Sequence, residues 1–522
     1  MTGNIYLVGF MGSGKSTVAA ALSETLNREA KDTDAELSRH FGKPFTEVFA
    51  QEGEVAFRTK ETAVLKRLAA RKRLVIATGG GLPVSDENRR IMAESGKTVF
   101  LDAALATCAG RLSDEERASR PLWRDRKAIE NLFERRRGIY AEADFTINVD
   151  GKTPDRIAEA LMPFLLPDES FSVRLGDTEC PIIATYNAPE ITAKLTTGAR
   201  TAVITDRTVA RLHLGRFPSP AEPVAVIDLP AGERSKTLGS VQRVYEAFIE
   251  KHVDRDDLLV ALGGGVVTDL AAFVGSTYKR GMRFIIVSTT LLGCVDAAVG
   301  GKAAVNLGDA KNVIGCFSIP TAVVLDLRAL STLAAKQIRE GLVEAYKTGL
   351  IAAPELADFI ERETEPLVRG DLPLLGHVAV KAAKIKAGVV SQDFRESGLR
   401  RILNFGHTFG HAVEAFNRFK ISHGAGVAAG MVLASRLSRI RGMIDEDTDG
   451  RIVSAIRRIY PGAVELPSPD EALELMRHDK KIRGGRLVFV LLEEVGRAVC
   501  VDDVTREELV EALAAVKEDT SG

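Results

Sequence analysis

Three of the eight histidines in the chain fall within residues 400–424, RRILNFGHTFGHAVEAFNRFKISHG. His407 and His411 are four residues apart, so on a helix they would share one face, and His423 follows shortly after them. Neutral imidazoles gathered in this way suit a divalent metal, most often zinc. The alternative is a polar helix whose histidines only cap and hydrogen-bond. Because basic and amide side chains converge on this stretch, we predict a metal site in a pocket for an anionic substrate.

A second stretch has the spacing of a phosphate-binding loop. A buried strand is expected at residues 5–8, followed by the loop GFMGSGKST at 9–17 and a helix at 18–26. The glycines let backbone N–H groups turn around phosphate oxygens, Lys15 supplies positive charge, and the Ser16 hydroxyl can ligate Mg²⁺. The alternative, a glycine-rich turn with a chance lysine, leaves the flanking strand and helix unexplained.

Residues suited to a phosphoryl acceptor follow this loop. Asp32 and Asp34 alternate along an extended segment, so one can reach a metal and the other a substrate hydroxyl. If the phosphate-binding loop were absent, we would interpret Asp32 and Asp34 as two solvated acids of a surface loop. Three glycines at residues 79–81, after an expected strand, would let a ligand contact the bare backbone.

The elements that would position these residues are those of an α/β protein. Strands are expected at residues 201–205, 224–229 and 258–262, which predicts a parallel α/β nucleotide-binding arrangement. The third strand leads into a triple glycine at 263–265 and not into the usual dinucleotide fingerprint. After Asp326 the chain becomes helical.

Lysine, aspartate and asparagine residues are dense among glycines between residues 280 and 312. A solvated face would not mix them with small apolar residues, so we predict a pocket for a charged, hydroxylated ligand. Further on, Glu344 and Lys347 lie three residues apart and hence on one face of a helix, where a surface ion pair is the alternative interpretation.

The composition narrows the class of protein. At 522 residues the chain should form two or more domains. A net charge of −1 and an aromatic content of 6% argue against a nucleic-acid or membrane-surface binder. Five scattered cysteines fit a reducing compartment, and we see no secretory signal and no bilayer-spanning apolar run. We therefore expect a cytoplasmic protein that acts on small molecules.

The periodic pattern breaks near Pro167, where prolines and acids interrupt it. We predict four segments: residues 1–166, with the P-loop and a parallel sheet; a linker at 167–180; an α/β nucleotide-binding part at 181–328; and a mostly α-helical part at 329–522.

Residues 1–165 resemble shikimate kinase, because the P-loop, Asp-x-Asp, GE-x-x-FR, triple glycine, RPL and R-x-x-x-Y motifs all match in order. The resemblance implies phosphoryl transfer from ATP–Mg²⁺ to shikimate. Asp34 would orient or deprotonate the attacking hydroxyl, and Arg117 would sit on a lid over the phosphates. The implied ATP contacts are Gly12, Ser13, Gly14, Lys15, Ser16, Thr17 and Arg117. The implied magnesium site is Ser16 and Asp32, and the implied shikimate contacts are Asp34, Arg58, Gly80 and Arg136.

Residues 170–522 resemble 3-dehydroquinate synthase, through the motifs GGGVVTD, STTLLGCVDAAVGGK, KNVIG, GLVEAYK, LNFGHTFGH and ISHG. The resemblance implies NAD, a divalent metal (zinc or cobalt) and a homodimer in which Arg280 reaches the neighbouring subunit's site. It assigns the metal to Glu344, His407 and His423, and it moves His411 to the substrate side, which corrects the simple pairing of His407 with His411.

The remaining roles implied by this resemblance concern NAD and the substrate. The implied NAD contacts are Asp206, Glu233, Lys236, Gly264, Gly265, Asp269, Thr289, Thr290, Lys302, Lys311 and Thr332. The implied substrate contacts are Arg280, Asp296, Asn312, Lys386, Arg400 and Asn404, with Lys302, Lys347 and His411 as catalytic groups and Lys480 or Lys481 closing on the phosphate end. Three positions depart from the family pattern. Ala425 stands where an acidic residue is usual, Gln337 where an acidic NAD contact is common, and Tyr346 where an aliphatic residue is usual.

Together the resemblances imply a bifunctional enzyme of aromatic amino-acid (chorismate) biosynthesis. One activity makes shikimate 3-phosphate, and the other converts 3-deoxy-D-arabino-heptulosonate 7-phosphate to 3-dehydroquinate and phosphate. In the second, NAD would oxidise an alcohol, which lets phosphate leave, and would then return its hydride.

Two alternatives stay open on the sequence. The C-terminal part could be a metal-dependent alcohol dehydrogenase, since such enzymes share the triple glycine and a helical metal domain, although the KNVIG segment and the lysines argue against it. The whole could be a regulatory protein whose degenerate kinase domain only senses ATP, although Lys15, Ser16, Asp32, Asp34 and Arg136 are all intact.

Overall fold

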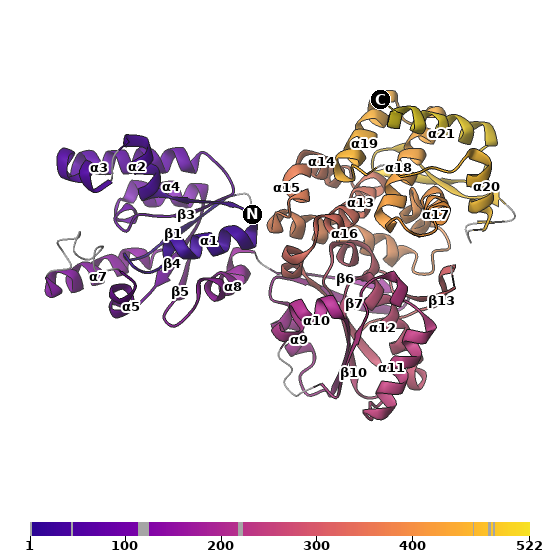
Figure 1. Ribbon diagram of the computed structural model, residues 1–522, viewed down its shortest axis with the longest axis horizontal. Coiled ribbons are helices and arrows are strands. Elements are labelled where there is room, and N and C mark those ends of the chain that lie inside the picture. Colours follow the sequence, from indigo (N-terminus) through magenta and orange to yellow (C-terminus); the bar gives the residue numbers. More distant parts are fainter. Residues whose placement is uncertain are drawn as a thin grey trace. The chain divides into compact units, whose positions relative to one another are not determined.

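The computed structural model describes residues 3–42, 45–112, 125–166, 168–217, 223–308, 310–462, 464–478, 482–483 and 486–521. The chain divides into two compact units, Met1–Pro167 and Asp168–Gly522. In Figure 1 the colours run from indigo at the start of the first unit to yellow at the end of the second. None of the described helices is long and apolar enough to cross a membrane.

The first unit is a five-stranded parallel sheet flanked by helices (Figure 1). The strand order is β2-β3-β1-β4-β5, and all five residues of the central strand β1 are buried, as in a strand covered on both faces. The strands are β1 Asn4–Val8, β2 Glu29–Asp32, β3 Leu74–Ala77, β4 Gly96–Asp102 and β5 Phe145–Asn148. The helices are α1 Lys15–Leu26, α2 Thr33–Phe41, α3 Phe45–Ala69, η1 Leu82–Val84, α4 Asp86–Ser95, α5 Leu105–Arg111, α7 Arg126–Tyr140 and α8 Pro154–Leu165.

The carboxyl-terminal edge of this sheet carries the predicted functional stretches. β1 leads into the glycine loop and α1, β2 ends at Asp32 where α2 begins, and β3 leads into the triple glycine. Neighbouring parallel strands end at the same edge, where open α/β sheets bind their ligands. Three segments that are far apart in the sequence therefore meet at one place.

The second unit starts with a seven-stranded sheet in the order β6-β7-β14-β11-β10-β8-β9, in which only β6 and β7 pair antiparallel. Helices α9 and α10 cover one face, and α11 and α12 cover the other (Figure 1). The strands are β6 Glu169–Leu175, β7 Thr178–Thr185, β8 Thr201–Asp206, β9 Ala225–Leu229, β10 Leu258–Gly263, β11 Arg283–Ser288 and β14 Ala322–Asp326, with a separate hairpin of β12 Lys302–Leu307 and β13 Ala310–Phe317. The helices are α9 Ala188–Leu195, α10 Arg207–His213, η3 Leu214–Arg216, η4 Glu233–Ser235, α11 Leu238–Glu250, α12 Gly265–Thr277, η5 Tyr278–Arg280, η6 Gly293–Ala297 and η7 Leu327–Thr332.

The linker predicted at residues 167–180 is wrong for most of its length. β6 occupies Glu169–Leu175 and pairs with β7, which begins at Thr178. Val173 and Leu175 on β6 are buried, whereas Ser172 and Arg174, which alternate with them, are exposed. This alternation is that of a half-buried edge strand, and its polar face gave the segment the composition of a loop.

The rest of the second unit is mostly α-helical, as predicted, with two added hairpins. The helices are α13 Ala335–Ala352, α14 Pro354–Arg362, α15 Thr364–Val368, α16 Leu372–Gln392, η8 Leu399–Asn404, α17 His407–Phe416, α18 His423–Ile440, α19 Glu446–Ile459, α20 Pro469–His478 and α21 Arg506–Ser521. The hairpins are β15 Ile482–Arg483 with β16 Arg486–Leu487, and β17 Phe489–Glu494 with β18 Arg497–Val501.

Helices α17 and α18 cross at a contact made by glycines. A Cβ atom added at Gly430 would overlap the carbonyl oxygen of Gly406 and lie 2.8 Å from the backbone nitrogen of Gly410. His407 and His423 are the first residues of the two helices, and their ring centroids lie 5.5 Å apart. The close backbone approach therefore sets the distance between the two histidines.

We expect Gly430→Ala to destabilise the second unit by about 1–3 kcal/mol, because the added methyl group must push α17 away from α18. Denaturant unfolding of the purified full chain measures this change. Gly388→Ala in α16 is the matched control, since its Cβ would meet nothing within 4 Å. Equal unfolding midpoints for the two variants would contradict the packing argument.

Candidate active sites

The glycine loop after β1 forms a cradle at the start of α1. Gly12 and Gly14 have φ angles of 81° and 92°, a region that favours glycine, and no side chain caps the helix at Gly14. Lys15 Nζ donates to the carbonyl oxygens of Gly9 and Phe10 at 3.0 and 2.9 Å. Backbone N–H groups at the helix start and the lysine charge together fit a phosphate group.

The predicted magnesium contacts adjoin this loop. Ser16 Oγ donates to Asp32 Oδ2 at 2.7 Å, while Asp32 Oδ1 caps α2 by accepting the N–H groups of Asp34 and Ala35 at 2.9 and 3.2 Å. The cap holds the carboxylate in place beside the serine hydroxyl. Ser13 is buried in the same loop, where the other predicted ATP contacts of this stretch also lie.

The triple glycine forms the floor of the acceptor pocket. Cβ atoms added there would overlap the Asp34 carboxylate and the Arg58 guanidinium, and one at Gly80 would lie 3.7 Å from Arg136 Nη1. The Tyr140 hydroxyl donates to Gly80 O at 2.5 Å, and burial raises the pKa of Tyr140 to about 12. The structure thus brings together the four residues predicted to contact the acceptor.

The two arginines of this pocket differ in their partners. Arg58 Nη1 donates to Glu61 Oε2 at 2.7 Å, and burial raises the pKa of the Glu61 carboxyl. Arg136 Nε is buried and has no hydrogen-bond partner within the described part of the chain. A planar carboxylate would satisfy such a guanidinium. Arg117, predicted on a lid, lies outside the described residues.

In the second unit, Glu344, His407 and His423 meet from α13, α17 and α18. Their ligand atoms lie within 4.8 Å of one another, with Glu344 Oε1 at 3.5 Å from His407 Nε2 and 3.3 Å from His423 Nε2. Both Glu344 oxygens are buried. A buried set of nitrogen and oxygen donors fits Zn²⁺ or Co²⁺ better than Mg²⁺.

The second nitrogen of each imidazole is held by an acceptor. His407 Nδ1 lies 3.2 Å from Phe405 O, and His423 Nδ1 lies 2.8 Å from Glu414 Oε1. Protons on the Nδ1 atoms leave the Nε2 atoms as ligands. Burial disfavours a charged His423, but Glu344 and Glu414 outweigh it and raise its pKa to about 10, so a metal ion has to displace that proton.

Sequence reasoning missed Glu414, which also belongs to a second candidate metal group with His411 and His423. The His411 ring centroid lies 5.6 Å from that of His407 and 6.2 Å from that of His423. Within the described residues, neither candidate group pairs His407 with His411. His411 therefore stands beside the Glu344 cluster and outside it.

Lys347 and Lys386 are buried cations beside the metal cluster. Lys347 Nζ lies 2.5 Å from Glu344 Oε2, and Lys386 Nζ donates to the Asp296 backbone oxygen at 2.8 Å and to its carboxylate. Burial lowers the pKa of Lys386 despite its pairing with Asp296. Burial also opposes the charge of Lys347, but Glu344 and Asp296 outweigh it and raise the pKa. These two buried ammonium groups suit an anionic ligand.

Glu396 links several predicted substrate residues and was also missed. Its carboxylate forms an ion pair with Lys302 and accepts from Asn404 Nδ2 at 2.7 Å. Nearby, Arg400 is 2% exposed and donates to Gly300 O at 2.9 Å. Glu396 lies between two helices with a positive φ of 57°, so no periodic pattern marked it.

The turn between β10 and α12 fits the diphosphate of a dinucleotide. A Cβ at Gly264 would lie 2.8 Å from Thr290 Cγ2, and one at Gly265 would lie 3.2 Å from Ala297 Cβ. No side chain caps α12, and Thr289 Oγ1 is buried without a hydrogen-bond partner among the residues described. A ligand with phosphate oxygens can therefore approach the backbone N–H groups of this 13-residue helix.

A polar network lines the approach to this turn. Lys236 Nζ lies 2.5 Å from both Asp269 Oδ2 and Asn312 Oδ1, and Glu233 Oε1 accepts from Asn306 Nδ2 at 2.8 Å. The structure thus groups four of the residues predicted to hold NAD or substrate, together with Asn306.

The other predicted residues of this part are dispersed. Lys311, on β13, pairs with the Glu414 carboxylate that also holds His423. Asp206 caps α10, and Thr332 ends η7. Arg280 is exposed, and no described contact ties it to the rest of the site. Lys480 and Lys481 lie outside the described residues.

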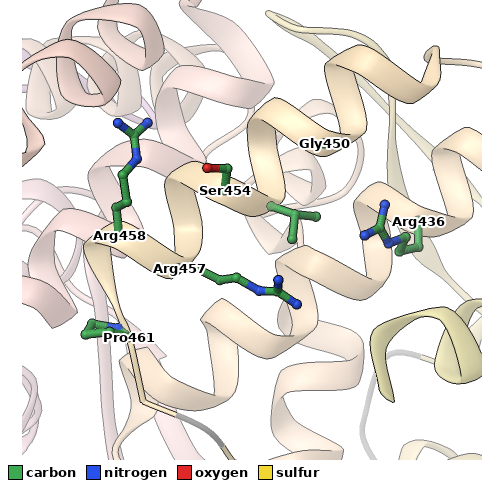
Figure 2. Close-up of a pocket in the computed structure, with 7 residues that line it drawn as sticks. Arg436, Gly450, Ser454, Arg457, Arg458 and Pro461 are labelled. Atoms are coloured by element: carbon green, nitrogen blue, oxygen red, sulfur yellow. The ribbon is translucent and has the colours of Figure 1, made fainter. Parts of the chain in front are cut away.

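A separate cavity of about 580 Å³ opens beside α18 and α19 (Figure 2). In Figure 2 Arg457 extends toward Arg436, whereas Arg458 points the other way. Arg436 already pairs with the buried carboxylate of Asp449. None of the predicted site residues lines this cavity; its lining is Arg436, Gly450, Val453, Ser454, Arg457, Arg458 and Pro461.

Comparisons with known proteins match both units. Family models match as shikimate kinase over residues 11–166, 3-dehydroquinate synthase N-terminal over 226–340 and 3-dehydroquinate synthase C-terminal over 341–482. A bifunctional shikimate kinase/3-dehydroquinate synthase of Thermotoga maritima is 33% identical over 502 residues, which cover 94% of this chain and 96% of that protein.

Two further relatives match the second unit. A 3-dehydroquinate synthase of Rhodopseudomonas palustris is 40% identical over 338 residues, or 62% of this chain and 88% of that protein. The solved structure of ValA, a 2-epi-5-epi-valiolone synthase from Streptomyces hygroscopicus with NAD⁺ and Zn²⁺ bound, is 28% identical with a TM-score of 0.61 and covers 66% of this chain and 98% of that chain.

We expect His411→Ala to retain bound metal and His423→Ala to lose it, because His423 belongs to both candidate metal groups and His411 to only one. Elemental analysis of the purified, dialysed full-length variants measures the metal content. His407→Ala serves as the second arm and should also lose metal. Retention by His407→Ala together with loss from His411→Ala would instead assign the metal to the group that contains Glu414.

Proposed function

We infer roles for individual residues in two reactions, because this chain belongs to the bifunctional shikimate kinase/3-dehydroquinate synthase family. Its first unit phosphorylates shikimate with ATP. Its second unit converts 3-deoxy-D-arabino-heptulosonate 7-phosphate to 3-dehydroquinate and phosphate. Both reactions belong to the shikimate pathway.

In the kinase unit, bound ATP–Mg²⁺ supplies the phosphoryl group and neutralises its charge. Lys15 exchanges its two loop carbonyls for phosphate oxygens, and Ser16 and Asp32 hold the magnesium ion. Arg58 and Arg136 bind the shikimate carboxylate, and this grip turns the acceptor hydroxyl toward Asp34. Asp34 then accepts or orients the hydroxyl proton, so that catalysis consists mainly of positioning and charge neutralisation.

In the synthase unit, NAD⁺, when bound, would supply a hydride acceptor that can return the hydride, and a divalent metal would supply polarisation of the reacting oxygen. Glu344, His407 and His423 hold the metal. The buried cations Lys347 and Lys386, with Arg400, bind the carboxylate and phosphate of the substrate. Their burial excludes water from these anionic groups and strengthens each contact.

The observation that carries this assignment is the buried Glu344 carboxylate, whose Oε1 lies 3.5 Å from His407 Nε2 and 3.3 Å from His423 Nε2. The bound NAD⁺ and Zn²⁺ of ValA support the same cofactors here. His411 stands beside the cluster and serves as the proton-transferring group on the substrate side.

We also propose a homodimer in which Arg280 completes the partner's synthase site. Support comes from the exposure of Arg280 and from the positive φ angles of 48° and 67° at Lys279 and Arg280, a backbone conformation that non-glycine residues adopt at a cost. We place both reactions in the cytoplasm, where ATP and NAD are available and where unpaired cysteines such as Cys108, Cys180 and Cys294 are stable.

We expect Arg136→Lys to weaken shikimate binding by roughly 10–100-fold while ATP binding changes little, because lysine cannot grip a carboxylate at two points. Isothermal titration of each ligand into the full chain measures both affinities. Arg137→Lys is the control, since this neighbouring arginine is half-exposed and pairs with Asp102. A larger loss for ATP than for shikimate would refute the assignment.

The whole assignment can be tested by removing and restoring metals. After chelation and removal of the chelator, Mg²⁺ alone should restore shikimate phosphorylation, because the Ser16–Asp32 site is lined by oxygen. Phosphate release by the synthase should stay low until Zn²⁺ or Co²⁺ is added, since Mg²⁺ binds imidazole poorly. If Mg²⁺ alone restored both activities, the histidine cluster would not be a transition-metal site.

A further inference from the structure

Tyr140 completes the R-x-x-x-Y motif, and the reaction described above gives it no role. It is the last residue of α7 and follows Arg136 by four residues, so the two side chains share one face of the helix. The ring is 1% exposed and packs against Phe100 of β4, with the ring centroids 5.5 Å apart. A phenylalanine would pack equally well at this position, so the hydroxyl group needs a separate explanation.

The Tyr140 hydroxyl lies where Arg136 meets the triple glycine. It donates to Gly80 O at 2.5 Å. A Cβ atom added at Gly80 would lie 3.7 Å from both Tyr140 Oη and Arg136 Nη1. Burial raises the pKa of Tyr140 to about 12, against the opposing effects of the Arg136 charge and of a hydrogen bond from the Arg136 side chain. One hydroxyl therefore contacts both an arginine and a backbone carbonyl of the acceptor pocket.

The direction of both hydrogen bonds follows from the groups themselves. A guanidinium can only donate and a carbonyl can only accept, so the phenol oxygen accepts from Arg136 and the phenol proton goes to Gly80 O. With a pKa of about 12, the phenol keeps that proton at neutral pH. We call this arrangement of Arg136, Tyr140 and Gly80 the hydroxyl bridge.

The hydroxyl bridge also fixes the peptide group between Gly80 and Gly81. The carbonyls of the other two glycines accept N–H groups within the turn itself, at 3.0 and 3.1 Å, whereas the Gly80 carbonyl is held by Tyr140. Because a peptide group is planar, the bond that fixes this carbonyl also fixes the direction of the Gly81 N–H. Gly81 adjoins the other arginine of the pocket, since a Cβ atom there would lie 2.5 Å from Arg58 Nη1.

We propose that Tyr140 is a positioning residue for the carboxylate of the acceptor, whose hydroxyl holds the Arg136 guanidinium and the Gly80–Gly81 peptide in one geometry before the acceptor binds. This inference rests on the proposed assignment of shikimate to this pocket. A guanidinium that is already oriented loses less conformational freedom when it grips a carboxylate. If the hydroxyl is removed, the acceptor itself has to order Arg136 and the peptide, which weakens its binding.

Steady-state kinetics of the full chain tests this role with Tyr140→Phe, which keeps the ring beside Phe100 and removes only the hydroxyl. The KM for shikimate should rise roughly 3–10-fold, the effect of one hydrogen bond. The KM for ATP should change by less than about twofold, because neither Arg136 nor Gly80 is among the predicted ATP contacts. The value of kcat should also change by less than about threefold, since the bridge acts on binding of the acceptor.

Tyr6→Phe is the matched control. Tyr6 is also buried in the first unit, and its hydroxyl pairs with Ser95 Oγ at 2.7 Å. This variant likewise loses one buried tyrosine hydroxyl, and it should leave both KM values unchanged. A rise in the KM for shikimate that is confined to Tyr140→Phe therefore reports on the acceptor pocket and not on the loss of a buried hydroxyl as such.

An altered acceptor separates positioning from a general disturbance of the pocket. An analogue in which the shikimate carboxylate is reduced to a hydroxymethyl group gives Arg136 nothing to grip at two points. The wild type should use this analogue poorly, and Tyr140→Phe should raise its KM by less than about twofold. In an Arg136→Lys background, Tyr140→Phe should raise the KM for shikimate by a smaller factor than it does alone, because both changes act through one contact.

Two results would overturn the proposal. One is an unchanged KM for shikimate in Tyr140→Phe. The other is an equal rise for shikimate and for the hydroxymethyl analogue, which would make the hydroxyl a structural group. If the wild type used both acceptors equally well, the assignment of a carboxylate to Arg136 would fail instead, and with it the function proposed for this pocket.

Discussion

Glu344 places a negative charge where water cannot solvate it, since its side chain is 1% exposed. Such a buried carboxylate costs several kcal/mol unless opposite charge surrounds it. Lys347 and the two imidazoles of His407 and His423 supply that charge, and against the effect of burial they hold the pKa of Glu344 well below its ordinary value. The glycine crossing of α17 and α18 brings His407 and His423 together, and α13 places Glu344 beside them.

A second buried carboxylate, that of Glu414, is likewise surrounded by positive charge, part of which comes from the hairpin of β12 and β13. Glu414 is as buried as Glu344, and despite that burial His423 and Lys311 hold its pKa at about 2. Lys311 lies on β13, in the hairpin that leaves the sheet, so one run of alternating charges links this hairpin to a metal ligand. The Glu414 carboxylate therefore contacts both a lysine of the hairpin and a histidine of the candidate metal cluster.

Local signals predicted much of this structure. The strand predicted at residues 258–262 is observed at Leu258–Gly263, because a buried parallel strand is a continuous apolar run. The P-loop was predictable because its strand, glycines and lysine are contiguous. β6 was missed because its exposed face is polar, and Glu396 and Glu414 were missed because their partners are distant in the sequence. For the same reason spacing alone paired His407 with His411, and only the family resemblance pointed to Glu344.

The two active sites differ in how their polar groups are satisfied before a ligand arrives. In the kinase loop, Lys15 is bonded to two carbonyls and Ser16 to Asp32, so a nucleotide exchanges existing hydrogen bonds for new ones. In the synthase cluster, Glu344 Oε2 pairs with Lys347 Nζ, and Oε1 faces the Nε2 atoms of His407 and His423 at 3.5 and 3.3 Å. A metal ion that binds there must displace the proton of His423, whose pKa is raised to about 10. Binding therefore exchanges hydrogen bonds in the kinase loop, whereas in the synthase cluster it exchanges a charge-assisted contact for a metal ligand.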